Sequence, residues 1–309
     1  MNKYIKDITT IIRDCSMENT YKMSWIRSIV EYCSKNPNIN KIKFEHLSLL
    51  IFKYYWNQTI FFNLVQGSNP NKPPEIYQLV KNKIQEYQFE NNHQPIFFNR
   101  IRNKINIDID KINRILKKDV SWRFTDLGKK KYEIYNLNIN DLSIEIPYPD
   151  KIKEHSDILF ELINYRWTQQ LEKFNSSPRI SKKVNCTDRE DIKRGGLSKF
   201  KKYLDLENPD HICFISGEKI DKDLSIDHVI PWSYLFSDDI WNLVYVKKSE
   251  NSSKSNKIPS EKTILKLEKR NKRLLEKMNN TGLKDKRFIE LKQSIEKDYV
   301  KEFWYGCKG

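Results

Sequence analysis

The stretch of sequence that decides the fold runs from His211 to Pro259 and reads HICFISGEKIDKDLSIDHVIPWSYLFSDDIWNLVYVKKSENSSKSNKIP. Apolar residues at 212–215 and at 224–230 predict two extended segments; the first turns at a Ser-Gly pair and the second stops at a proline. A third extended segment is expected at 243–246 and the start of a helix at 250–254. Two strands, a long loop and a helix predict a small ββα unit.

The polar residues of this stretch suit the hydrolysis of a phosphodiester. Asp227 and His228 lie in the second extended segment, where successive side chains point to opposite faces unless the backbone bends. A carboxylate and a carboxamide offer hard oxygen ligands for Mg²⁺ or Mn²⁺, and a neutral imidazole can take a proton from an attacking water. The polar residues at 237–239 are predicted to cap a short helical turn that leads to Asn242.

The order and spacing of these residues resemble the HNH, or ββα-metal, nuclease motif, especially the form found in the HNH domain of RNA-guided CRISPR nucleases. The resemblance rests on DHVIP at 227–231, on Asn242 fourteen residues after the histidine, and on Asn-x-x-Lys from Asn251 to Lys254. It covers the stretch from 211 to 259.

The resemblance implies a role for each matching residue. His228 would be the general base that activates water, and Asp227 and Asn251 would hold one Mg²⁺ or Mn²⁺ ion. Asn242 would brace the loop and His228 without touching the metal, and Lys254 would place its ammonium group near the phosphate. Taken singly, each residue also has a structural interpretation, such as a packed histidine or a polar turn. Their joint order and spacing favour the nuclease interpretation.

One departure from the resemblance concerns zinc. Many relatives carry two Cys-x-x-Cys pairs that flank the centre and bind a structural zinc ion. The corresponding positions here read CFIS at 213–216 and KSEN at 248–251, so that only Cys213 remains. We therefore expect no structural zinc, and apolar packing has to hold the unit together instead. The side chains expected to do so are Phe214, Ile226, Trp241, Leu243 and Tyr245.

The net charge of the chain is strongly positive, at +15, with an isoelectric point of about 9.3. This excess of Lys and Arg favours a polyanionic partner, because neutralising phosphates releases condensed counterions. A composition that is merely rich in Lys and Asn is the alternative. Basic residues concentrate at 173–202, where a solvated face is the alternative to phosphate contact. The residues expected to contact phosphates are Arg179, Lys182, Lys183, Lys193 and Arg194.

The remaining composition points to a cytoplasmic protein without membrane segments. Five scattered cysteines with no Cys-x-x-Cys pair suggest no disulfide framework. Residues 1–20 lack the apolar core of a signal peptide, and unbroken apolar stretches such as 49–52 are too short to span a bilayer.

An α+β fold in two domains is expected for the whole chain. Apolar residues recur at helical spacing between residues 4 and 33, and 44–65 is apolar on most faces, as in a buried central helix. Strand-like alternation at 132–146, closed by two prolines, places a boundary near residue 150. Residues 1–150 are predicted to form a mostly helical domain that recognises DNA or docks a partner. Residues 151–309 are predicted to form the HNH nuclease domain with flanking basic helices.

The predicted function is metal-dependent hydrolysis of DNA phosphodiester bonds, with double-stranded DNA as the partner. The resemblance suggests restriction or anti-phage defence as the biological setting. The sequence allows a protein partner or a homodimer. Two alternatives remain: a nuclease subunit active only within a partner-gated complex, for example with an ATPase, and a non-catalytic nucleic-acid-binding HNH module. The chain has no Gly-rich phosphate-binding loop, so nucleotide gating would come from another chain.

Overall fold

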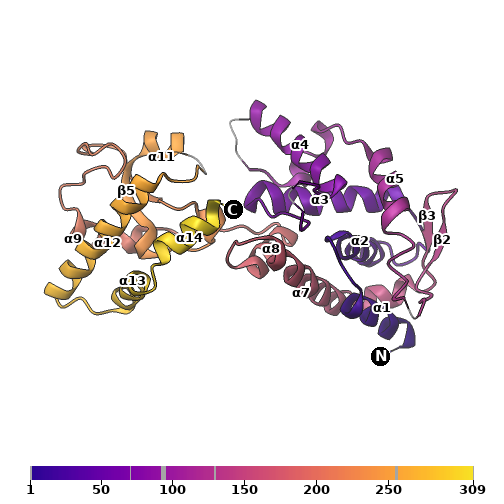
Figure 1. The fold of residues 1–309 in the computed structure, drawn as a ribbon. Coiled ribbons are helices and arrows are strands. Elements are labelled where there is room, and N and C mark those ends of the chain that lie inside the picture. The colour runs from indigo at the N-terminus through magenta and orange to yellow at the C-terminus, as the bar shows by residue number, and fades with distance from the viewer. Residues whose placement is uncertain (1, 70, 92–94, 129, 255–256, 309) are drawn as a thin grey trace. The chain divides into compact units, whose positions relative to one another are not determined.

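The computed structural model describes residues 2–69, 71–91, 95–128, 130–254 and 257–308, and the side chains of residues 253 and 254 lie outside this description. The chain divides into two compact units (Figure 1). Unit 1 comprises residues 1–175 and 180–192, and unit 2 comprises residues 176–179 and 193–309. Helices dominate and the sheets are small, which confirms the α+β class expected from the sequence.

The division between the units falls later than the expected boundary near residue 150. Helix α7 (Ser156–Phe174) follows that position but belongs to unit 1, where it packs against α2 (Tyr21–Lys35). Its Leu159, Ile163 and Trp167 side chains are fully buried. The strand alternation before residue 150 therefore marks the end of a small sheet and not the end of a domain.

Unit 1 is built around α3 (Phe44–Phe62), the central helix that the apolar run predicts. α3 buries side chains on most of its faces, among them Phe52, Tyr55 and Trp56. Because a helix that is apolar all round needs neighbours on every side, other helices surround it. Further helices of unit 1 are α1 (Lys3–Asp14), α4 (Glu75–Glu90), α5 (Ile109–Asp119), α6 (Pro149–Glu154) and α8 (Ile180–Asp188), with 3₁₀ turns η1 (Phe98–Arg100) and η2 (Arg102–Lys104).

A small antiparallel sheet accompanies these helices. Its strand order is β1 (Lys41–Lys43), β3 (Ser143–Glu145), β2 (Asn136–Asn138). Ile144 of the central strand lies opposite Ile42 in the register, and both side chains are buried. Strands are thus present within the predicted 132–146 segment, but they are shorter than the alternation suggests.

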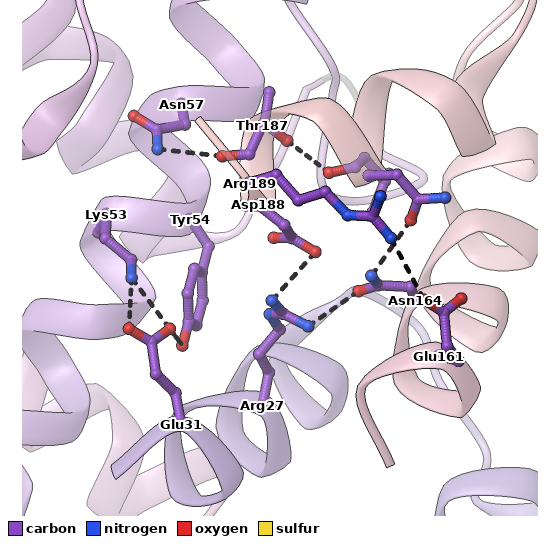
Figure 2. Close-up of polar contacts among 12 residues, drawn as sticks. Arg27, Glu31, Lys53, Tyr54, Asn57, Glu161, Asn164, Thr187, Asp188 and Arg189 are labelled. Carbon is purple, nitrogen blue, oxygen red and sulfur yellow. Dashed lines mark hydrogen bonds and ion pairs between the residues drawn. The ribbon is translucent and has the colours of Figure 1, made fainter. Parts of the chain in front are cut away.

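Buried charged side chains tie α2, α3 and α8 together inside unit 1 (Figure 2). The Nη2 of Arg27 lies 3.2 Å from the Oδ2 of Asp188, which ends α8. Glu31, one helical turn after Arg27, accepts hydrogen bonds of 2.6 Å from Lys53 and Tyr54 of α3. An unpaired buried charge is costly, so these pairs strongly favour one packing of the three helices.

Unit 2 is centred on an antiparallel pair of strands, β4 (Leu224–His228) and β5 (Leu243–Lys247). β5 runs directly into helix α11 (Lys248–Lys254). These elements are the second and third extended segments and the helix that the sequence predicts. Together they form a ββα arrangement.

The prediction of a strand at 212–215 is wrong. Ile212 makes only an isolated bridge to Lys219, because the chain between them turns tightly. Gly217, with a positive φ of 80°, donates its N–H to the carbonyl of Cys213 at 2.9 Å. The left-handed conformation at Gly217 favours glycine and ends any extended pairing there.

Helices enclose the strand pair of unit 2 and share one apolar core with it. Leu204, Trp241, Leu243, Leu274 and Trp304 are among the buried members of this core. The helical elements are η3 (Ser198–Phe200), α9 (Lys201–Glu207), α10 (Trp232–Leu235), η4 (Ile240–Asn242), α12 (Glu261–Asn280), α13 (Lys286–Glu296) and α14 (Tyr299–Lys308). No described helix in either unit is long and apolar enough to cross a membrane.

Candidate active site

Asp227 and His228 close strand β4 and lie on opposite faces of the strand pair. In the register Asp227 lies opposite Val244, and His228 lies opposite Leu243. Side chains two residues apart on a strand share a face, so Asp227 shares its face with Ser225. Asp227 is half-buried, whereas His228 is only 8% exposed.

The two candidate metal ligands lie on the same side of the strand pair. Asn251 of α11 donates its Nδ2 to the Oγ of Ser225 at 3.1 Å, which brings its carboxamide to the face that carries Asp227. Asp227 also lines a pocket of about 400 Å³, together with Val244 and with Glu250 of α11. A carboxylate and a carboxamide oxygen fit Mg²⁺ or Mn²⁺, which keep several water ligands.

A denser set of metal ligands is absent from the described part of unit 2. Among the residues that the structure describes, no group of three or more His, Cys, Asp or Glu side chains is placed to hold a metal ion. An ion at Asp227 and Asn251 would therefore depend on water and substrate oxygens for its remaining ligands.

His228 has a carboxylate partner that the sequence analysis missed. Its Nε2 lies 3.0 Å from the Oδ1 of Asp238, and the two side chains are 10% and 16% exposed. The hydrogen bond from His228 lowers the pKa of Asp238, against the effect of burial. Residues 237–239 were expected only to cap the next turn, yet η4 begins after Asp239 without a side-chain cap. Spacing carries no signal for this contact, which the fold of the loop creates.

Asn242 is fully buried and holds the chain that follows His228. Its Oδ1 accepts the N–H of Ile230 and its Nδ2 donates to the Ile230 carbonyl, both at 2.8 Å. The Asn242 carbonyl accepts the N–H of Val229 at 2.9 Å. Three hydrogen bonds thus join the η4 turn to the end of β4.

Side chains from two later helices support the η4 turn. Arg270 of α12 donates to the carbonyl of Ile240 at 3.0 Å, and Asn271 donates to the carbonyl of Trp241 at 2.8 Å. Glu290 of α13 accepts the N–H of Ile240 at 2.6 Å. Because Asn242 follows directly, α12 and α13 fix where its side chain lies.

Arg194 is a basic candidate that interacts electrostatically with Asp227 and Asp238. Its guanidinium stands 4.6 Å from the centre of the Trp232 ring. Desolvation lowers the pKa of Arg194, while the charges of Asp227 and Asp238 raise it. A cation whose charge acts on both carboxylates is a candidate for contact with a phosphate at the same site. Lys193, the preceding residue, is exposed.

The other basic candidates have different surroundings. Lys183 is fully buried in unit 1, with its ammonium 5.6 Å from the centre of the Phe62 ring, so this expected phosphate contact is wrong. Arg179 donates to the carbonyl of Leu235 at 2.7 Å and braces that loop. Lys182 is exposed on α8 of unit 1. Lys254 ends α11, and its side chain lies outside the described residues.

The two positions where relatives carry zinc-binding pairs lie together in unit 2. The Sγ of buried Cys213 donates to the Oε2 of Glu250 at 2.6 Å. A direct thiol–carboxylate hydrogen bond thus links the turn before β4 to α11. The Tyr245, Leu243 and Trp241 side chains expected to hold the unit are buried in the shared core.

One comparison with known proteins finds a match within unit 2. A family model described as HNH endonuclease matches residues 213–260, which include Asp227, His228, Asn242 and Asn251. Unit 2 therefore carries an HNH endonuclease segment, and the resemblance seen in the sequence is confirmed over that range. Such segments belong to nucleic-acid hydrolases that typically use divalent metal ions. Neither the curated proteins nor the solved structures contain a match to this chain.

Proposed function

We propose that the protein is an endonuclease that hydrolyses DNA phosphodiester bonds with the help of one Mg²⁺ or Mn²⁺ ion. The observation that carries the proposal is the arrangement at the end of β4. His228 is held there by Asp238 and the Asn242 turn, and Asp227 shares its face with Asn251. The candidate base and one candidate ligand are thus neighbours in the chain at the end of β4, and the brace and the second ligand each make a hydrogen bond to β4 or to the residues that follow it.

Different residues of unit 2 have different roles in the proposed hydrolysis. Asp227 and Asn251 would hold a divalent ion, which would supply positive charge to stabilise the phosphorane and the leaving oxygen. His228 takes a proton from a water, whose oxygen forms a bond to phosphorus. The bond from phosphorus to the adjoining nucleotide oxygen breaks, and that oxygen gains a proton from solvent. Arg194 binds and orients a phosphate of the substrate strand.

A nucleic acid is proposed as the substrate on charge, and DNA in particular on the family resemblance. The net charge of +15 favours a nucleic acid, and contacts to phosphates carry no base sequence. Sequence selection would then come from another surface, and unit 1 is the candidate, either as a DNA reader or as a docking site for a partner. Restriction or anti-phage defence is the proposed setting, from the family resemblance.

The test is cleavage of supercoiled and linear DNA by wild type and His228→Ala, with Mg²⁺, Mn²⁺ or EDTA. We expect metal-dependent cutting that falls by roughly 10²- to 10⁴-fold in the variant, the usual contribution of a general base. His211→Ala is the matched control, because His211 also contacts an aspartate at 3.0 Å but is solvent-exposed.

Two results would contradict the proposal in different ways. Cutting that survives His228→Ala would remove this residue as the base. No cutting by pure wild type with any metal would favour a subunit that needs a partner, or a module that only binds nucleic acid. Binding of DNA without cutting separates the second of these from an inactive preparation.

A further inference from the structure

The loop between β4 and η4 folds back so that the carboxylate of Asp238 contacts His228, the candidate base. Asp238 lies ten residues after His228, and its Oδ1 is 3.0 Å from the imidazole Nε2. Both side chains are largely buried, so the contact is shielded from water. A hydrogen bond to an ionised carboxylate is stronger than a neutral one, and low exposure increases that strength further.

Asp238 itself is held in place from more than one side. The hydrogen bond from His228 lowers the pKa of Asp238, and the Trp232 side chain lowers it further. The backbone passes close to the other carboxylate oxygen at Gly195, where an added Cβ would lie 3.3 Å from Oδ2. The carboxylate is therefore ionised near neutral pH and confined between His228, Trp232 and Gly195.

A confined carboxylate determines which imidazole nitrogen carries the proton. An ionised Asp can only accept, so neutral His228 must carry its hydrogen on Nε2 to make this bond. The lone pair of the neutral ring then resides on Nδ1. A carboxylate at the opposite nitrogen also stabilises the imidazolium that forms when the ring gains a second proton.

We propose that Asp238 is a positioning residue that fixes His228 in the Nε2–H tautomer, so that Nδ1 is the nitrogen that takes the proton from water. The inference rests on the proposed nuclease function for its effect on turnover. The assignment of the tautomer depends on the fold alone. Asp238 touches neither substrate nor metal in this scheme and acts only through His228.

The chain offers a matched control for this pair. His211 and Asp205 of unit 2 repeat the same Nε2-to-Oδ1 contact at 3.0 Å, but their side chains are 39% and 50% exposed. Asp205→Asn therefore removes the same charge from a more exposed pair that has no place in the proposed reaction, and the asparagine carbonyl can still accept the hydrogen bond of the Tyr245 hydroxyl. Asp238→Asn is nearly isosteric, and its amide can donate to Nε2, which permits the other tautomer.

The experiment combines spectroscopy on the metal-free full-length protein with kinetics on the same variants. Nitrogen-15 NMR of the ring of His228 in wild type should show hydrogen on Nε2 alone, and Asp238→Asn should show a mixture or the reverse tautomer. With Mg²⁺ present, kcat of Asp238→Asn should fall on the order of 10- to 100-fold with little change in KM. Asp205→Asn should match wild type in both measurements.

Several results would overturn the inference. A single Nε2–H tautomer and wild-type kcat in Asp238→Asn would show that Asp238 has no positioning role. An equal loss of kcat in Asp205→Asn would assign the effect to net charge. Thermal melting identifies a variant that fails to fold, in which case Asp238→Ala takes its place. If wild type cuts no DNA, the proposed function fails, while the NMR comparison still decides whether Asp238 fixes the tautomer.

Discussion

Asn242 and Ile230 are joined by a reciprocal pair of hydrogen bonds, each 2.8 Å long, between one side-chain amide and one backbone peptide group. The side chain of Asn242 is fully buried, and Ile230 lies two residues after the candidate base His228. A carboxamide is suited to this task, because it is donor and acceptor at once. The pair links the loop after β4 to the turn before β5.

Replacement of Asn242 by alanine should destabilise unit 2 and disturb His228. The change leaves a buried N–H and a buried carbonyl of Ile230 without partners, which costs about 1–3 kcal/mol. We expect lower cleavage activity and a lower midpoint of chemical denaturation. Asn280→Ala, at the exposed end of α12, is the control. Equal stability of the two variants would contradict the bracing role.

Loss of either proposed metal ligand should raise the metal requirement of cleavage. Asp227→Asn and Asn251→Ala each remove one of two protein ligands, so the Mg²⁺ concentration for half-maximal cutting should rise by about tenfold or more. Glu250→Gln is the control, because Glu250 lines the same pocket but is engaged by Cys213. If the Mg²⁺ concentration for half-maximal cutting is unchanged in Asp227→Asn and Asn251→Ala, these residues are not the metal ligands.

Arg194→Ala should weaken DNA binding in a manner that depends on salt. One phosphate contact fewer means that the slope of log affinity against log salt becomes shallower by about one. Arg194→Lys should keep the charge but lose the planar contact with the Trp232 ring, with an intermediate effect. Fluorescence anisotropy at several salt concentrations measures both. Lys297→Ala, an exposed residue after α13, should leave the slope closer to wild type.

The Cys213–Glu250 contact predicts a unit that folds without zinc. Elemental analysis of the purified protein should find no stoichiometric zinc, and EDTA should leave the melting temperature unchanged. Cys213→Ala removes a donor to a charged acceptor and should destabilise unit 2 by about 1–3 kcal/mol. Cys213→Ser keeps a donor and should lose less. One equivalent of tightly bound zinc would contradict this prediction.

Unit 1 should lose stability in acid through Glu31. Burial alone would raise the pKa of this carboxyl, but the charge of Lys53 and a hydrogen bond from Lys35 help lower it from 4.5 to about 2. A lowered folded-state pKa means that the contribution is complete above pH 4.5 and disappears as the pH falls towards 2. A pKa change of one corresponds to about 1.4 kcal/mol, and Glu31 is not fully titrated at pH 3, so we expect a loss on the order of 1–2 kcal/mol between pH 6 and pH 3.

Denaturation of wild type and Glu31→Gln at pH 6 and at pH 3 measures this contribution. The variant should be less stable than wild type at pH 6, and the difference should shrink at pH 3. Glu86→Gln, which removes an exposed ion pair with Lys83, should show little change at either pH. A constant difference between wild type and Glu31→Gln would show that Glu31 does not titrate in this range.

Much of unit 2 could be predicted from the sequence, because its signals are local. A short apolar run predicted the strand at 243–246, and the order Asp-His, Asn, Asn-x-x-Lys predicted the HNH segment that the family model matches. The central helix of unit 1 was likewise visible as a long apolar run. The strand expected at 212–215 failed, because four apolar residues do not show whether a partner strand lies beside them.

The sequence by itself determined the fold class, the HNH segment and the residues that suit its chemistry, since each depends on short-range pattern and composition. Only the tertiary structure placed α7 in unit 1, buried Lys183 against Phe62, and brought Asp238 to His228. Burial and pairing depend on residues that are distant in the chain. The local sequence around a lysine in a basic run does not show whether its helix face is solvent-exposed or buried in a core. Likewise, the sequence of a loop does not show that one of its aspartates will contact a distant imidazole.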